Sequence, residues 1–173
     1  MVNPGRPEPG EYVEYFDTYI SLVQEENIFD ALEQQIETLN EFVSRVPADQ
    51  LAVLHAPYTW TIKQVFGHCV DTERVFGYRA GRFAAADTAS LPGFDQDEFV
   101  AHTDYDSVEL AKLNEELVAL RQSNLLMLQR QSETSWLRSG VADGKSMTVR
   151  AAAYILVGHV RYHLNIVAKR LGW

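Results

Sequence analysis

Two histidines near the end of the sequence, His159 and His163, lie four residues apart in the segment Gly158-His159-Val160-Arg161-Tyr162-His163. Residues at this spacing share one face of an α-helix, so their imidazoles can reach the same metal ion. In helical phase both fall on the side of Leu156 and Ile166, which we expect to face the core. The pattern fits two interpretations, namely buried histidines hydrogen-bonded to carbonyls or carboxylates, or a pair of metal ligands.

A third histidine would favour the metal site, because a catalytic metal ion typically has three protein ligands and one open position. Of the three other histidines, His55, His68 and His102, the best placed is His68. It lies about 120° from Ile62, the apolar centre of its predicted helix, on the flank of the buried face. That position suits a ligand facing a cavity between helices, and it suits a half-exposed histidine equally well.

The composition narrows the class of protein. A length of 173 residues fits a single domain, 1–173, in which the Pro/Gly-rich residues 1–10 form an irregular arm. The net charge of −9, with no basic stripe, argues against a nucleic-acid partner. The one cysteine, Cys69, excludes an internal disulfide. Without a signal peptide or a membrane-spanning stretch, we expect a cytoplasmic protein with no membrane partner.

Apolar residues at helical spacing predict four long helices, over residues 28–46, 61–85, 106–131 and 148–172. A short helix is predicted over 12–23, and one or two further turns over 95–102. We find no alternating run of apolar and polar residues that would indicate a substantial strand. The polar stretch 132–147 contains Gly140 and the turn dipeptide Asp143-Gly144. The fold class is therefore all-α, a four-helix bundle with a long crossover at 86–106 between the second and third helices.

Helix starts are marked by capping residues. Thr61 and Gln64 form a capping box ahead of the second long helix. Asp106-Ser107 is expected to cap the third helix, and Thr148 the fourth. Gly172 ends the last helix.

Three segments together resemble a known family. The DinB-like (YfiT-like) metalloenzyme family has a Trp-Ser/Thr-Ile-x-x-x-x-Gly-His segment. It is similar to Trp60-Thr61-Ile62-Lys63-Gln64-Val65-Phe66-Gly67-His68, which is followed here by Asp71 and Glu73. Gly158-His159 with His163 resembles that family's Gly-His-x-x-x-His segment. Leu91-Pro92-Gly93-Phe94-Asp95-Gln96-Asp97 resembles a stretch found in one branch. The ordered likeness extends over residues 26–171.

The resemblance implies an up-down-down-up four-helix bundle in which His68, His159 and His163 bind one divalent metal ion, zinc or nickel. It also implies a homodimer. Two positions depart from the family pattern: Tyr162 stands where a second histidine is frequent, and Cys69 replaces a large aliphatic residue. Neither change removes a ligand.

Three neutral imidazoles would leave the ion positively charged, with a position open for water or for the sulfur of a thiol. Relatives include transferases that activate a low-molecular-weight thiol and hydrolases, so the resemblance implies either reaction on a small-molecule substrate. The sequence has no Gly-x-Ser-x-Gly elbow, phosphate loop or dinucleotide fingerprint. The alternative function is a non-catalytic, metal-stabilised bundle acting as a stress-related or interaction protein.

Several other side chains are candidates to orient an imidazole or to shuttle a proton, namely Glu73, Asp95 and Tyr162. Asp71 is a weaker candidate, because its phase, about 180° from Ile62, directs it to solvent. Consecutive residues of a helix point about 100° apart, so Cys69 and His68 face different directions. We therefore expect Cys69 to pack in the core instead of binding the same ion.

Overall fold

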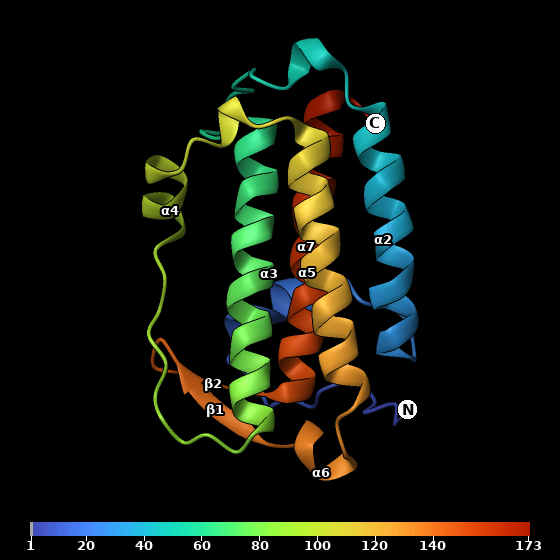
Figure 1. Ribbon diagram of the computed structural model, residues 1–173, viewed down its shortest axis with the longest axis vertical. Helices are drawn as coiled ribbons and strands as arrows, with labels where there is room; N and C mark the ends of the chain where they lie inside the picture. The colour runs from blue at the N-terminus through green and yellow to red at the C-terminus, as the bar shows by residue number, and fades with distance from the viewer. Residues whose placement is uncertain (1) are drawn as a thin grey trace.

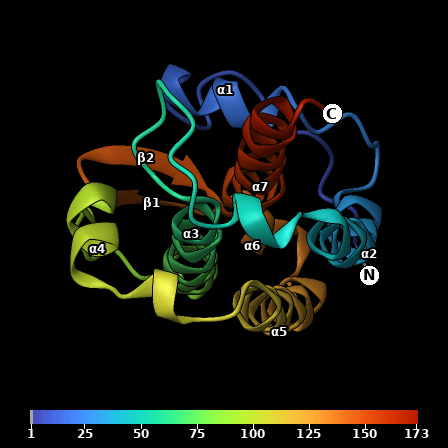
Figure 2. The ribbon, with the colours of Figure 1, turned by 90° about the horizontal axis from the view of Figure 1, so that it is seen from above.

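Four long helices form the body of the computed structural model, which describes residues 2–173. They are α2 (Ile28–Arg45), α3 (Ile62–Ala84), α5 (Leu110–Gln129) and α7 (Val149–Leu171). Seen from above, they occupy the corners of a bundle (Figure 2). The prediction of a four-helix bundle is confirmed.

Local capping explains most of the helix ends. The side chain of Asn27 accepts a hydrogen bond from the Phe29 amide at the start of α2. Thr61 and Gln64 form the predicted capping box of α3, and Thr148 caps α7. These side chains satisfy amide groups that have no partner within the helix. At the far end of α7, Gly172 adopts a left-handed conformation with φ of 73°, which suits glycine best.

Residues 85–109 connect α3 to α5 along the outside of the bundle, and they include α4 (Gln96–His102) (Figure 1). The predicted Asp106-Ser107 cap of α5 is wrong, because α5 begins at Leu110 and has no side-chain cap. The carboxylate of Asp106 instead accepts a hydrogen bond from Thr61 Oγ1, 2.7 Å away. This bond ties the connection to the start of α3.

The polar stretch between α5 and α7 contains a short helix, α6 (Glu133–Trp136), and an antiparallel hairpin of β1 (Ser139–Ala142) and β2 (Lys145–Thr148). The predicted all-α fold thus needs one addition, this short two-stranded sheet. Asp143 and Gly144 have φ of 53° and 68°, the left-handed values that a tight two-residue hairpin turn requires.

The N-terminal residues 2–25 lie against α7. They contain a 3₁₀ turn (Glu14–Phe16) and α1 (Asp17–Ile20), a shorter helical segment than the one predicted over 12–23. Figure 2 shows α1 beside α7, on the outside of the four-helix bundle. Arg161 fastens this segment through an ion pair with Glu25 at 2.6 Å. As a result, α7 is covered on all sides, and every residue from 151 to 160 is buried.

The two helices that carry the histidines, α3 and α7, pack directly against each other. No helix within residues 2–173 combines the length and apolar character that crossing a lipid bilayer demands.

Candidate metal centre

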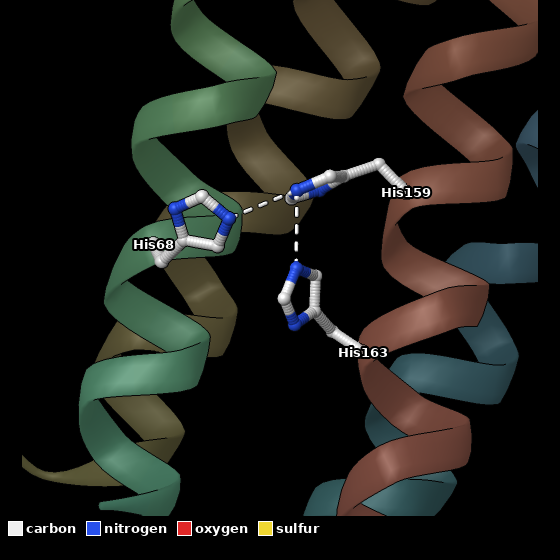
Figure 3. Close-up of side chains that lie close together, drawn as sticks. All are labelled: His68, His159 and His163. Atoms are coloured by element: carbon white, nitrogen blue, oxygen red, sulfur yellow. Dashed lines mark hydrogen bonds between the residues drawn. The ribbon is translucent and has the colours of Figure 1, made fainter. Parts of the chain in front are cut away.

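His68 on α3 and His159 and His163 on α7 point their Nε2 atoms toward one another (Figure 3). The Nε2 atom of His159 lies 2.9 Å from that of His68 and 3.2 Å from that of His163. His68 and His159 are buried, and His163 is partly buried. The structure thus brings the three predicted ligands into one cluster.

The spacing of these nitrogens fits a shared ion. Two imidazole nitrogens bound to one zinc ion at about 2.0–2.1 Å with tetrahedral angles would lie roughly 3.3 Å apart. An imidazole nitrogen also offers either one N–H or one lone pair, never both. His159 Nε2 can therefore form a hydrogen bond to only one of its two close neighbours. A cation among three lone pairs would satisfy all three nitrogens at once.

Burial keeps the three imidazoles neutral. It lowers the pKa of His68 to about 4 and that of His163 to about 3, where the neighbouring His68 adds to the effect. Burial also lowers the pKa of His159 well below its usual value, with further contributions from the other two histidines and Arg121. Only neutral imidazoles bind metal ions, so the cluster is ready to bind one near neutral pH.

Each histidine packs against an aromatic ring. The ring centroid of Trp60 lies 5.0 Å from that of His68, Tyr19 lies 5.2 Å from His159, and Tyr162 lies 5.2 Å from His163. These rings limit the rotation of the imidazoles and the access of water. Tyr162, one of the candidate proton-shuttle residues, is thus a neighbour of the cluster.

At the glycine that precedes His68 and at the one that precedes His159, a neighbouring residue leaves no room for a side chain. A Cβ on Gly67 would collide with the ring of Tyr105, and a Cβ on Gly158 would collide with the backbone carbonyl of Tyr19. Gly158 therefore lets α1 approach α7 closely, which brings the Tyr19 ring onto His159.

The carboxylate candidates lie elsewhere. Glu73 is buried in an ion pair with Arg121, and Asp95 caps α4 through the amides of Asp97 and Glu98. Within residues 2–173, neither carboxylate forms a hydrogen bond to a histidine of the cluster. Asp71 was expected to face solvent, but it is half-buried because its carboxylate accepts a hydrogen bond from the Tyr105 hydroxyl.

Cys69 packs in the core, as predicted. The side chain is buried in the core, and burial raises the pKa of its thiol.

Two pockets flank the cluster. One, of about 250 Å³, is lined by His68 and His159, together with residues of α1, α3 and the hairpin. The other, of about 290 Å³, is lined by His163, Trp60 and Arg170. Sequence reasoning missed the contribution of α1 and the hairpin, for which no motif gives a signal. Thr72 and Arg79 of α3 also line the first pocket, on the same flank of the helix as His68.

A family model described as the DinB superfamily matches residues 31–167, most of the chain. The chain belongs to the DinB superfamily.

Among solved structures, this DinB-superfamily chain is similar to YfiT from Bacillus subtilis, described as a probable metal-dependent hydrolase with an unusual four-helix bundle topology. The two share 19% sequence identity, with a TM-score of 0.73 over 99% of each chain. That likeness establishes a common fold. No curated protein matches the sequence.

Proposed function

We propose that His68, His159 and His163 bind one divalent metal ion and that the protein is a metal-dependent enzyme of hydrolase or thiol-transferase type. The observation that carries this proposal is the convergence of three buried or partly buried Nε2 atoms, with 2.9 and 3.2 Å between neighbours. A shared divalent ion would satisfy all three neutral imidazoles, whose nitrogens cannot all satisfy one another.

Zinc or nickel is the proposed ion, because imidazole ligands suit both metals. Among the described residues, the cluster comprises three histidines and no fourth His, Cys, Asp or Glu ligand. Three protein ligands with an open position are typical of catalytic sites, whereas structural zinc sites are closed by four.

A bound divalent ion would lower the pKa of a water or thiol and so provide a nucleophile near neutral pH. The protein would orient the ligands and bind the substrate. Trp60, Tyr19 and Tyr162 hold the three imidazoles in place, and the adjoining pockets admit a small-molecule substrate. Hydrolysis is supported by the description of YfiT, and thiol transfer, with a low-molecular-weight thiol, by the resemblance to DinB-like transferases.

The proposal extends to the whole molecule. We expect one domain, 1–173, with the four helices in the order up-down-down-up, which the course of the 85–109 connection supports (Figure 1). The family resemblance supports a homodimer, and the single free cysteine supports a cytoplasmic location. Light scattering coupled to size-exclusion chromatography measures the oligomeric state.

Elemental analysis of untagged protein tests the site. We expect about one zinc or nickel ion per chain. His159→Ala should lose it, because His159 Nε2 is the nitrogen closest to both others. His102→Ala is the matched control, since His102 is exposed on α4 and should retain the metal. Full metal content in His159→Ala/His163→Ala would refute the site.

Activity is then measured with esterase and thiol-transfer substrates after the metal is restored. Turnover that requires the ion and disappears in His159→Ala supports the enzyme. A metal-loaded protein inactive in both assays contradicts these two reaction types.

A further inference from the structure

One face of α3 forms a continuous wall of the 250 Å³ pocket, with His68, Thr72, Phe76 and Arg79 in order along it. At a rise of about 1.5 Å per residue, Thr72 lies roughly 6 Å from His68 along the helix axis, and Arg79 roughly 16 Å from it. His68 and Arg79 therefore lie at opposite ends of this wall, and the guanidinium folds back over Phe76.

Arg79 is a buried cation that Asp143 stabilises only at a distance, because the ion pair of Asp143 is with Lys145. The residue is only 5% exposed, yet it forms no ion pair within residues 2–173. Its one hydrogen bond goes from Nη2 to the Pro92 carbonyl at 3.2 Å. The guanidinium also lies over the ring of Phe76, 4.9 Å from its centroid. Most of its five N–H groups remain available, and a buried charge is costly unless something pairs with it.

The charges near Arg79 leave this end of the pocket positive. Asp143 and Lys145 of the hairpin also line the pocket, and they form an ion pair with each other. One aspartate and two cations sum to a single positive charge. A monoanion balances that charge, whereas a dianion such as a phosphate monoester would meet the carboxylate of Asp143.

Thr72 gives a second, independent indication of a ligand. Its side chain is 3% exposed, and Oγ1 is buried without a hydrogen-bond partner. Leaving a buried hydroxyl unpaired costs about 1–3 kcal/mol, so such groups usually have a partner. Because Thr72 lines the pocket between His68 and Arg79, a ligand in the pocket is within reach of this hydroxyl.

We propose that this pocket binds an elongated monocarboxylic acid. Its carboxylate pairs with the guanidinium of Arg79 beside Phe76, a polar group midway along it bonds to the Thr72 hydroxyl, and its apolar body extends from there along the pocket. The other end reaches the histidine cluster. As an assignment of substrate class, this rests on the proposed function, but the binding site itself needs no metal ion.

A simpler role for Arg79 would be to hold the 85–109 connection in place through its hydrogen bond to Pro92. The experiment separates this structural role from ligand binding. The probe is hippurate (N-benzoylglycine), which carries a carboxylate, a central amide and a phenyl ring. Its uncharged counterpart is N-benzoylglycinamide. Isothermal titration calorimetry on the metal-free wild-type protein should show hippurate binding, with the amide weaker by about tenfold or more.

Arg79→Gln should weaken hippurate binding by about tenfold or more, because it removes a charge-assisted hydrogen bond, and leave binding of the amide nearly unchanged. Thr72→Val should weaken both probes by a few-fold. Arg74→Gln is the matched control, since Arg74 lies on the same helix but pairs with Glu116 at the surface, and it should bind both probes as wild type does. If Arg79→Gln does not fold, the wild-type preference for hippurate over the amide and its weakening by salt decide the question.

Equal binding of the two probes, hippurate binding that survives Arg79→Gln, or no hippurate binding at millimolar concentration would overturn the proposal. So would tighter binding of phenyl phosphate than of hippurate. Hippurate that binds only to metal-loaded protein, independently of Arg79, would place the carboxylate on the ion and overturn it too. Failure of the metal site would appear separately, in the elemental analysis.

Discussion

Gly158 precedes the central histidine of the cluster, and the backbone of Tyr19 occupies the space where a side chain would be. We predict that Gly158→Ala destabilises the protein by about 1–3 kcal/mol, because α1 must move away from α7. Urea unfolding measures the change.

Gly81 provides the matched control for this glycine. It lies inside α3, and a Cβ there would meet no other atom within 4 Å. Gly81→Ala should therefore stabilise the protein slightly, because alanine has the higher helix propensity. Equal stability of wild type and Gly158→Ala would contradict the packing described for α1.

The titration of the histidines makes the metal-free protein sensitive to acid. In the unfolded chain a histidine has a pKa of about 6.5, whereas burial lowers the pKa of His68 to about 4. Between these values the unfolded chain binds more protons, so the free energy of unfolding falls as the pH falls. From pH 7 to pH 5 we expect a loss of about 2 kcal/mol from His68 alone.

Urea unfolding of the chelated protein at several pH values checks this slope. His68→Asn should make the slope shallower, and His102→Gln, at an exposed position, should leave it unchanged. A free energy of unfolding that stays constant between pH 7 and pH 5 would contradict neutral buried histidines.

At the scale of the helices, Arg121 of α5 joins all four. Its guanidinium forms a two-pronged ion pair with Glu73 of α3, with bonds of 2.9 and 2.8 Å. It also donates to the side chain of Gln35 on α2 and to the Leu156 carbonyl on α7. Both charged side chains are at most 1% exposed. This polar node fixes the register of α3 and α7, which carry the histidines.

We predict that Arg121→Met destabilises the protein by about 3–5 kcal/mol, because Glu73 becomes a buried, uncompensated charge. The double variant Glu73→Met/Arg121→Met should recover much of that loss, since it buries no charge. Urea unfolding of the wild type, of Glu73→Met, of Arg121→Met and of the double variant gives the coupling energy. Additive losses would show that the ion pair contributes no specific coupling.

The sequence predicted the helices well where apolar periodicity and a capping residue agree, as at Thr61 and Thr148. It failed where short-range signals compete. The four-residue strands β1 and β2 are too short to show alternation, although the Asp143-Gly144 turn was visible. The start of α5 was misplaced because Asp106 bonds to Thr61, a partner 45 residues away that local reasoning cannot supply.

The candidate site shows the same division. The spacing of His159 and His163 is local, so their shared face was predictable, but the burial of His68 depends on how α3 packs against α7. The position of Glu73 on its helix does not predict which side chain pairs with its carboxylate. Its pairing with Arg121 is a contact between helices, and no sequence spacing encodes it.

At the scale of the whole molecule, two apolar clusters fill the bundle on either side of the polar node and the histidines. The histidines are not needed to bury these clusters. We therefore predict that removal of the ion with a chelator abolishes activity but preserves the helical circular dichroism signal.

The outcome separates an enzyme from the non-catalytic, metal-stabilised bundle. In the latter, metal-binding free energy is folding free energy, and the chelated protein would melt far below the metal-loaded form. If the protein is an enzyme, restoring zinc or nickel to the chelated sample should recover its activity. This recovery would show that chelation did not damage the protein irreversibly.

The distance along the chain between the two helices that supply the histidines also has a consequence for biogenesis. His68 and His159 are 91 residues apart, and α7 is the last described helix to be translated. At about 5–20 residues per second, a ribosome makes α2, α3 and α5 several seconds before His159. A nascent chain holds at most one of the three imidazoles during that interval. The three-histidine cluster therefore cannot form until α7 has been made and has packed against α3.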